Sequence, residues 1–171
     1  MRIAYRNARA EDAAALAAFS RDTFVETFGH LYPPEDLAAF LAAKYGTEIQ
    51  GQEIADETLL YRLAFESDAL VGYCKTGPMS LPVDPGAAKA LELHRLYVAT
   101  RVKGAGVART LMDEALAWAR AQGAEAMYLG VWENNRRAQA FYRRYGFEHV
   151  GEHGFMVGRV SDHDFIWRLQ L

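Results

Sequence analysis

The stretch best suited to chemistry is a glycine-containing turn that joins a predicted strand to a predicted helix. Leu91–Val98 has the apolar run of a strand, and Gly104-Ala105-Gly106 precedes a helix with an apolar stripe. The first turn of a helix presents unpaired N–H groups and the positive end of its dipole, and glycine lets a phosphate approach them closely. The turn therefore indicates a phosphate or pyrophosphate site, although an ordinary tight turn would show the same glycines.

Two common nucleotide-binding loops do not fit this turn. A P-loop needs a glycine, four residues, and then Gly-Lys followed by Ser or Thr, which is absent from the sequence. The dinucleotide-binding fingerprint needs a third Gly or Ala where Arg109 stands, and an acidic residue about 20 positions on, whereas Glu133 lies further away. Both classes of nucleotide-binding protein are therefore disfavoured.

A second stretch, 131–147, has the pattern of a capped helix that carries a possible proton donor. Asn134 or Asn135 is placed to cap the helix N-terminus, and Gly146 is placed to end the helix. One face forms a stripe of Ala138, Phe141, Tyr142 and Tyr145. A tyrosine hydroxyl on such a stripe can donate a proton or can simply pack in the core.

Together the two stretches resemble the GNAT superfamily of N-acetyltransferases. After Val98, the acetyl-CoA loop of that family has Gln or Arg, then Gly, then Gly or Ala, at the positions of Lys103, Gly106 and Ala108. Lys103 departs from the pattern but keeps a positive charge. The downstream family signature matches at Asn135, Ala138, Phe141, Tyr142, Gly146 and Phe147.

The resemblance implies a fold, a cosubstrate and a set of contacts. The expected fold is α/β (α+β), with one domain over 1–171 and a mixed, mostly antiparallel sheet of about six to seven strands flanked by about four helices. The expected cosubstrate is acetyl-CoA, without a metal. Main-chain groups of Leu96 and Val98 would pair with pantetheine, and N–H groups from Lys103 to Ala108 would hold the pyrophosphate. The predicted contacts are Leu96, Tyr97, Val98, Lys103, Gly104, Ala105, Gly106, Val107, Ala108 and Asn135.

The resemblance also implies catalytic roles. Tyr142 matches the family tyrosine that protonates the leaving CoA thiolate. The acceptor amine must lose a proton, because an alkyl ammonium with a pKa of ~10 has no lone pair. Glu92 lies six residues before Val98, where some members carry a general base, and His94 shares its strand face. Either side chain could instead be structural.

A closer likeness concerns the acceptor. The segments 26–31, 130–133 and 151–155 resemble bacterial spermidine/spermine N-acetyltransferases, which implies a polyamine substrate. The predicted acceptor contacts are Glu26, His30, Tyr32, Glu35, Trp132 and Glu133. Two alternatives stay open: an amine on a protein, or a catalytically silent module that senses acyl-CoA.

Composition limits the other classes of function. The chain of 171 residues has a net charge of −3, which disfavours a nucleic-acid partner. No apolar run approaches the ~20 residues that cross a bilayer, so we expect a cytoplasmic enzyme without a membrane partner. The single cysteine, Cys74, lies in an apolar strand pattern and predicts a buried thiol. Family members often dimerise, so the resemblance leaves a homodimer open.

The elements that must position these residues alternate in type. Strands are expected at 3–9, 58–66, 69–76, 91–98, 126–132, 147–157 and 164–169. Helices are expected at 11–27 and 35–45, then from the glycine turn to Gly123, and from Asn135 to Gly146.

Overall fold

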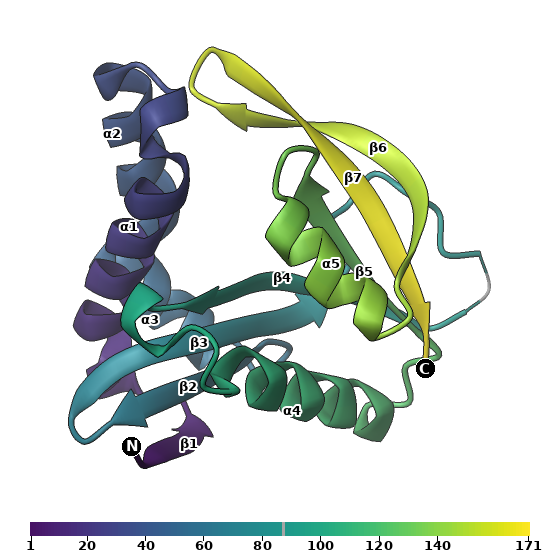
Figure 1. The fold of residues 1–171 in the computed structure, drawn as a ribbon, viewed down its shortest axis with the longest axis horizontal. Coiled ribbons are helices and arrows are strands. Elements are labelled where there is room, and N and C mark those ends of the chain that lie inside the picture. Colours follow the sequence, from purple (N-terminus) through teal and green to yellow (C-terminus); the bar gives the residue numbers. More distant parts are fainter. Residues whose placement is uncertain (87) are drawn as a thin grey trace.

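The computed structural model describes residues 1–86 and 88–171, and in these residues it shows one seven-stranded sheet covered by helices (Figure 1). The strand order across the sheet is β1-β2-β3-β4-β5-β7-β6. The strands are β1 (Ile3–Asn7), β2 (Leu60–Glu66), β3 (Ala69–Pro78), β4 (Ala90–Val98), β5 (Ala126–Trp132), β6 (Glu148–Val157) and β7 (Val160–Gln170). The expected mixed, mostly antiparallel sheet is confirmed.

Only one neighbouring pair of strands is parallel in the described chain. β4 and β5 run in the same direction, and every other neighbouring pair is antiparallel. A parallel pair needs a long crossover, and the helix α4 supplies it here. The helices are α1 (Ala13–Phe28), α2 (Pro34–Tyr45), α3 (Thr47–Ala55), α4 (Val107–Ala121) and α5 (Arg136–Arg144).

Helix α4 packs on one face of the sheet through its apolar stripe. Val107, Leu111 and Ala115 are buried at spacings of four, as an amphipathic helix requires. They join Leu91 and Leu93 of β4 in the largest apolar core. Burying a Val or Leu side chain contributes about 1.5–3 kcal/mol, so this packing fixes the helix that begins at the glycine turn.

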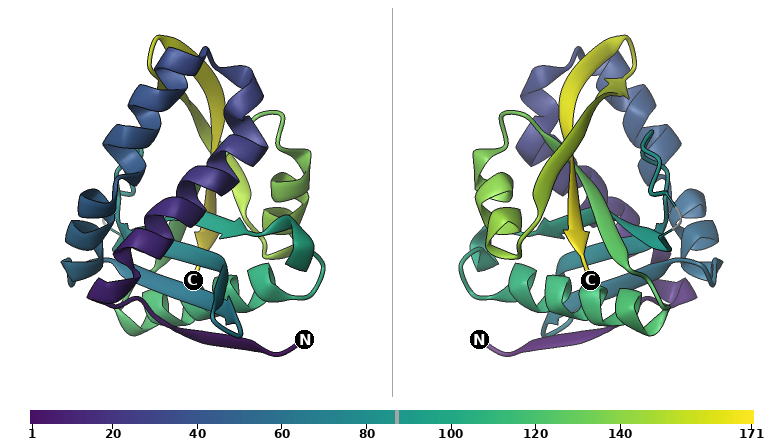
Figure 2. Two further views of the ribbon diagram at one scale, coloured as in Figure 1. Left: turned by 90° about the vertical axis from the view of Figure 1, so that its left-hand side faces the viewer. Right: turned by 90° about the vertical axis from the view of Figure 1, so that its right-hand side faces the viewer.

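Helices α1 to α3 lie on the other side, and the β6–β7 hairpin reaches across to them (Figure 2). At the hairpin tip, Arg159 Nε lies 3.3 Å from Asp36 Oδ1 on α2. Gly158 is needed there because a Cβ would lie 2.4 Å from the same oxygen. The hairpin thus closes over the space beside α1. Within the described residues, no helix is long and apolar enough to cross a bilayer.

Two elements differ from the sequence-based expectation. Helix α3 was not predicted, because its sequence is polar and contains Gly51; Gln50 holds it by donating to the Lys44 carbonyl at 2.9 Å. Strand β7 begins at Val160, four residues before the predicted start at Asp164. Pairing with β6 keeps this polar segment extended, which its own sequence does not indicate.

A β-bulge interrupts β4 at His94. Lys75 of β3 pairs with Arg95, whereas the next residue, Thr76, pairs with Leu93. The extra residue reverses the alternation, so that Leu93 and Leu96 both face the core beneath α4. Bulges of this kind re-aim side chains next to active sites.

Candidate active site

The sheet opens between β4 and β5. The two strands pair only at Ala90, Leu91 and Glu92 of β4, and from Leu93 to Val98 that edge of β4 has no strand partner on β5. Unpaired main-chain groups inside a sheet can accept an extended ligand as an added strand. The open edge therefore has the form that a pantetheine arm requires.

The glycine turn lies at the end of this open edge. Gly104 has φ 90° and Gly106 has φ 84°, and both values favour glycine over any residue with a Cβ. Lys103 and Ala105 donate their N–H groups to carbonyl oxygens within the turn, at 3.2 Å each. The prediction that the whole run from Lys103 to Ala108 offers N–H groups is therefore corrected. The two glycines and the first turn of α4 are the part left free for an anion.

Tyr142 faces a cavity next to the open edge. Its hydroxyl has no hydrogen-bond partner among the described residues, and Asn135 and Ala138 line the cavity beside it. Burial raises the pKa of Tyr142, so the phenol stays protonated at neutral pH. Asn135 Oδ1 accepts from the Ala138 N–H at 3.2 Å, so this asparagine caps α5 as well as lining the cavity. A phenol in this position can donate a proton to a leaving group.

Glu92 and His94 are adjacent, as predicted, but their bonding is already complete. Glu92 Oε2 accepts from the N–H groups of Ser80 and Leu81 at 2.7 and 3.1 Å, and from the Ser80 hydroxyl. Burial alone would raise the pKa of Glu92, but hydrogen bonds from His94 and Ser80 outweigh it and lower that pKa. Glu92 therefore resembles a structural anchor, and it does not line the cavity.

His94 does line the cavity, yet both of its ring nitrogens face acceptors. Nε2 lies 2.9 Å from the Pro78 carbonyl oxygen, and Nδ1 lies 3.2 Å from Glu92 Oε1. A neutral imidazole donates from one ring nitrogen only, and the lone pair on the other nitrogen here points at an acceptor oxygen. In this arrangement His94 is placed to hold the strand and the loop, and a role as base would require one contact to break.

The cavity has aromatic walls and two carboxylates. Its lining comes from α1, the segment after it, β4, β5, α5, β6 and β7, and comprises Phe24, Phe28, Tyr32, Leu93, His94, Arg95, Leu96, Tyr97, Gly130, Val131, Trp132, Asn135, Ala138, Tyr142, Phe155, Asp162 and Asp164. Phe28 and Trp132 meet edge to face across it, with ring centroids 6.0 Å apart. Of the predicted contacts, Leu96, Tyr97, Asn135, Tyr32 and Trp132 line this space.

The cavity lining contains both positive and negative side chains. Arg95 is buried over the ring of Tyr45, and its Nη1 lies 3.7 Å from Glu53 Oε2. Glu53 also pairs with Lys75 at 2.8 Å, so it offsets only part of the positive charge of Arg95. Asp162 accepts a hydrogen bond from Tyr32, whose pKa is raised by burial and then by this bond. Asp164 accepts none within the described chain, and the cavity thus holds two carboxylates against the one guanidinium of Arg95.

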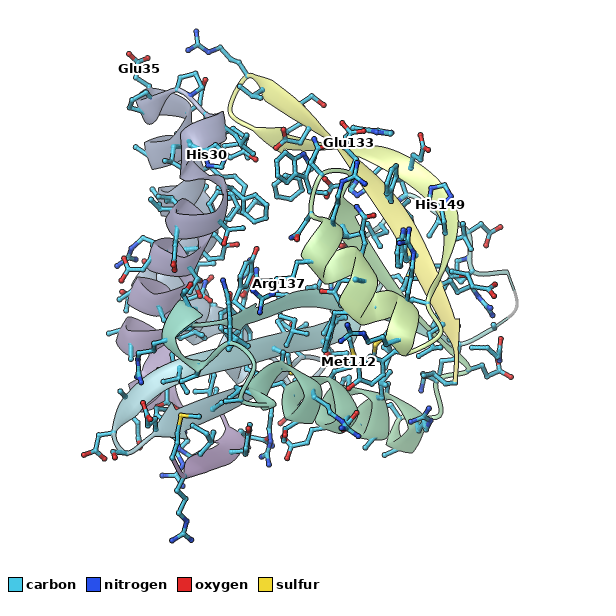
Figure 3. The ribbon with its side chains drawn as sticks, in the orientation of Figure 1. His30, Glu35, Met112, Glu133, Arg137 and His149 are labelled. Atoms are coloured by element: carbon cyan, nitrogen blue, oxygen red, sulfur yellow. The ribbon has the colours of Figure 1, made fainter. Side chains whose placement is uncertain are left out.

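Four predicted acceptor contacts lie outside the lining of this cavity, and their role stays a prediction. Glu26 accepts from the Thr100 hydroxyl at 2.6 Å, beside the glycine turn. His30 is exposed, and Glu35, also exposed, lies in the first turn of α2 (Figure 3). Glu133 binds His163 Nδ1 at 2.9 Å outside the cavity lining. None of the four lines the cavity described above.

The comparison with known proteins assigns the family. The Acetyltransferase (GNAT) family matches residues 16–147. An uncharacterised N-acetyltransferase from Lactobacillus delbrueckii subsp. lactis is 30% identical over 164 residues, covering 94% of this chain and 93% of the relative. An uncharacterised N-acetyltransferase from Mycobacterium tuberculosis is 30% identical over 155 residues, covering 91% and 95%. The chain belongs to the GNAT family of acetyltransferases.

Solved structures share the fold. The PaiA N-acetyltransferase of Thermoplasma acidophilum, in complex with coenzyme A, aligns over 100% of both chains with a TM-score of 0.81 and 23% identity. NAA60 of Arabidopsis thaliana, in complex with acetyl-CoA, covers 99% of both chains with a TM-score of 0.77 and 16% identity. Family and fold together define an acetyl-CoA-dependent N-acyltransferase.

The site fits such a cosubstrate. The open β4 edge suits the pantetheine arm, the glycine turn suits the pyrophosphate, and the Tyr142 hydroxyl can reach a sulfur in the cavity. Among the described residues, no group of three or more His, Cys, Asp and Glu side chains is placed to hold a metal ion. Cys74 is buried, and burial raises its pKa to about 12, so it serves packing as predicted.

Proposed function

We propose that the acceptor is a small primary amine with more than one positive charge, of the spermidine and spermine class. The observation that carries this proposal is the pair Asp162 and Asp164 in a cavity with aromatic walls. Carboxylates attract ammonium groups, and aromatic faces hold both cations and the methylene segments between them. The same segments, 26–31, 130–133 and 151–155, resemble polyamine acetyltransferases in sequence.

In the proposed reaction the amine attacks the acetyl carbonyl directly, without a covalent enzyme intermediate. Tyr142 protonates the departing thiolate, because its phenol is protonated, lines the cavity and has no hydrogen-bond partner among residues 1–86 and 88–171. A main-chain N–H near Val98 on the open edge supports the developing oxyanion.

The test is thiol release from acetyl-CoA with a panel of amines. The panel should contain spermidine, spermine, putrescine, propylamine, an amino acid, an aminoglycoside and a lysine peptide. We expect kcat/KM for spermidine to exceed that for singly charged propylamine by at least about tenfold, as a second ion pair would provide. Equal values, or turnover of the lysine peptide alone, would contradict a polyamine acceptor. Tight acetyl-CoA binding without any turnover would instead favour the sensing module.

A further inference from the structure

We propose that Asp164 is the residue that takes the proton from the acceptor amine. The inference rests on the proposed N-acetyl transfer to an amine in the same cavity. The geometry distinguishes Asp164 from Glu92 and His94, the two bases that the sequence suggested. Asp164 lines the cavity, whereas Glu92 does not, and His94 has both ring nitrogens directed at acceptors.

The main chain holds Asp164 at a fixed place beside the open edge. On β7 it pairs with Trp132 at the end of β5 and with His153 of β6. Its side chain is 13% exposed. Gly130 of β5 lies beside it, since a Cβ there would be 3.8 Å from Asp164 Oδ2, an ordinary van der Waals distance. The carboxylate is therefore enclosed by three strands and reaches the same cavity as Tyr142.

The oxygens of Asp164 are free to receive a proton. Within the described chain neither of them accepts a hydrogen bond, in contrast with Asp162, which is held by Tyr32. His153 Nε2 lies 4.0 Å from Asp164 Oδ2, too far for a hydrogen bond, and this buried nitrogen has no partner among the described residues. The unpartnered His153 nitrogen is buried, and the partly exposed Asp164 carboxylate faces the cavity, where a ligand group can complete its bonding.

The surroundings also raise the affinity of this carboxylate for a proton. Burial, and then the charge of Asp162, raises the pKa of Asp164 to about 6; His163 lowers it and Glu133 adds to the increase. A base whose pKa approaches the working pH takes a proton more readily than an ordinary aspartate does. The titratable groups near Asp164 are Asp162 and His163 on β7, His153 on β6, Glu133 after β5, Tyr32 after α1, and His94 and Arg95 across the cavity on β4.

The protons balance in the following way. One N–H bond of the ammonium breaks, its electron pair stays on nitrogen, and the proton goes to Asp164. The neutral amine forms the C–N bond, the C–S bond breaks, and the thiolate takes the proton of Tyr142. A second proton of the same nitrogen returns to Tyr142, and Asp164 releases its proton to solvent. An ammonium and the thioester thus give an amide, a thiol and one proton.

The test compares the pH profiles of wild type and Asp164→Asn. In wild type, kcat/KM for spermidine should fall about tenfold per pH unit below about pH 6. The variant should lose at least about 10²-fold in kcat/KM at pH 7. Without this base, the variant can use only amine that is already neutral. The neutral fraction of the amine rises tenfold per pH unit up to the amine pKa of ~10. The ratio of wild type to variant should therefore shrink as the pH rises. A ratio that stays constant from pH 7 to 10 would overturn the proposal.

Two measurements separate a catalytic loss from a damaged fold. Asp164→Asn should keep the acetyl-CoA Kd of wild type, measured by calorimetry. In carbon-13 spectra, one aspartate carboxyl of wild type should titrate near pH 6 and disappear in the variant. Titration of that carboxyl below pH 4.5 would count against the role, because the group would be too weak a base.

Variants of Asp162 and Glu92 test whether Asp164, and not a neighbouring carboxylate, is the base. Asp162→Asn should raise the KM for spermidine and keep a decline in rate at low pH, shifted below about pH 6 because the charge of Asp162 helps to raise the pKa of Asp164. If Glu92→Gln removes that decline while Asp164→Asn keeps it, Glu92 is the base and the proposal fails. The acceptor proposal can fail without the proposal for Asp164. If wild type used only singly charged amines, the acceptor would not be a polyamine. The same pH profiles, measured with a singly charged amine, would still test the role of Asp164.

Discussion

At the scale of single residues, the site depends on which polar atoms are already bonded and which are not. Glu92 and Tyr142 were both predicted as catalytic groups; Glu92 is fully bonded, whereas the hydroxyl of Tyr142 has no partner among the described residues. A side chain whose bonds are complete holds the fold, whereas an unpartnered one can act on a substrate. Sequence spacing could place both residues near the site, but bonding is visible only in the structure.

Replacing Tyr142 with Phe should remove the proton donor and keep the packing. We expect kcat to fall by about 10²- to 10³-fold, with an unchanged acetyl-CoA Kd, since the ring that lines the cavity remains. Tyr145→Phe on the same helix is the matched control. Its hydroxyl bonds Asp113 Oδ1 at 2.8 Å outside the cavity, so the control should keep kcat. Equal kcat values in the two variants would show that Tyr142 is not the acid.

Asp164 should also influence stability, with a sign that follows from its pKa. The folded pKa of about 6 lies above the unfolded value of 3.8, so the folded state pays to keep this carboxylate ionised. The cost is absent below about pH 4, grows between pH 4 and 6, and is complete above pH 6. Asp164→Asn should therefore raise Tm by a few degrees at pH 8 and leave it unchanged near pH 4. A lower Tm at pH 8 would mean that the ionised carboxylate stabilises the fold.

At the scale of elements, the left-handed backbone of the glycine turn should affect both the stability of the fold and the binding of acetyl-CoA. Gly106 has φ 84°, and a Cβ there would meet no atom within 4 Å, so alanine would strain the backbone without a clash. Gly123, after the other end of α4, has φ 76° and is equally open. Both Gly→Ala changes should cost about 1–2 kcal/mol in unfolding free energy. Only Gly106→Ala should weaken acetyl-CoA binding, by about tenfold, when both are measured by calorimetry. Similar affinities in the two variants would place the pyrophosphate elsewhere.

The elements also show what the sequence could and could not predict. Strand β4, the glycine turn and α5 were predicted because local spacing and glycines determine them. Asp162 and Asp164 were missed as site residues, although their spacing of two places them on one strand face. Their role depends on the pairing of Asp164 with Trp132, and such contacts between distant segments leave no local signal.

At the scale of the whole molecule, the opening in the sheet divides the chain into two parts. Strands β1 to β4 form one part and β5 to β7 the other, and three residue pairs near Glu92 are the strand contacts between them in the described chain. Helices α4 and α5 pack into the same core and add to the connection. A ligand bound along the open edge of β4 would contact both parts and so should stabilise the whole domain.

This leads to a prediction for acetyl-CoA binding. At a concentration 100 times its Kd, acetyl-CoA should stabilise the fold by about 2.7 kcal/mol and raise Tm by about 5–10 °C. Hydrogen exchange should slow most at the amides of 93–98 and in the first turn of α4, because the ligand covers the open edge and the turn. The β2–β3 hairpin is the internal control, since its main chain is already paired along both strands. Protection that is equal in the hairpin and in β4 would show that the ligand stabilises the domain without occupying the opening.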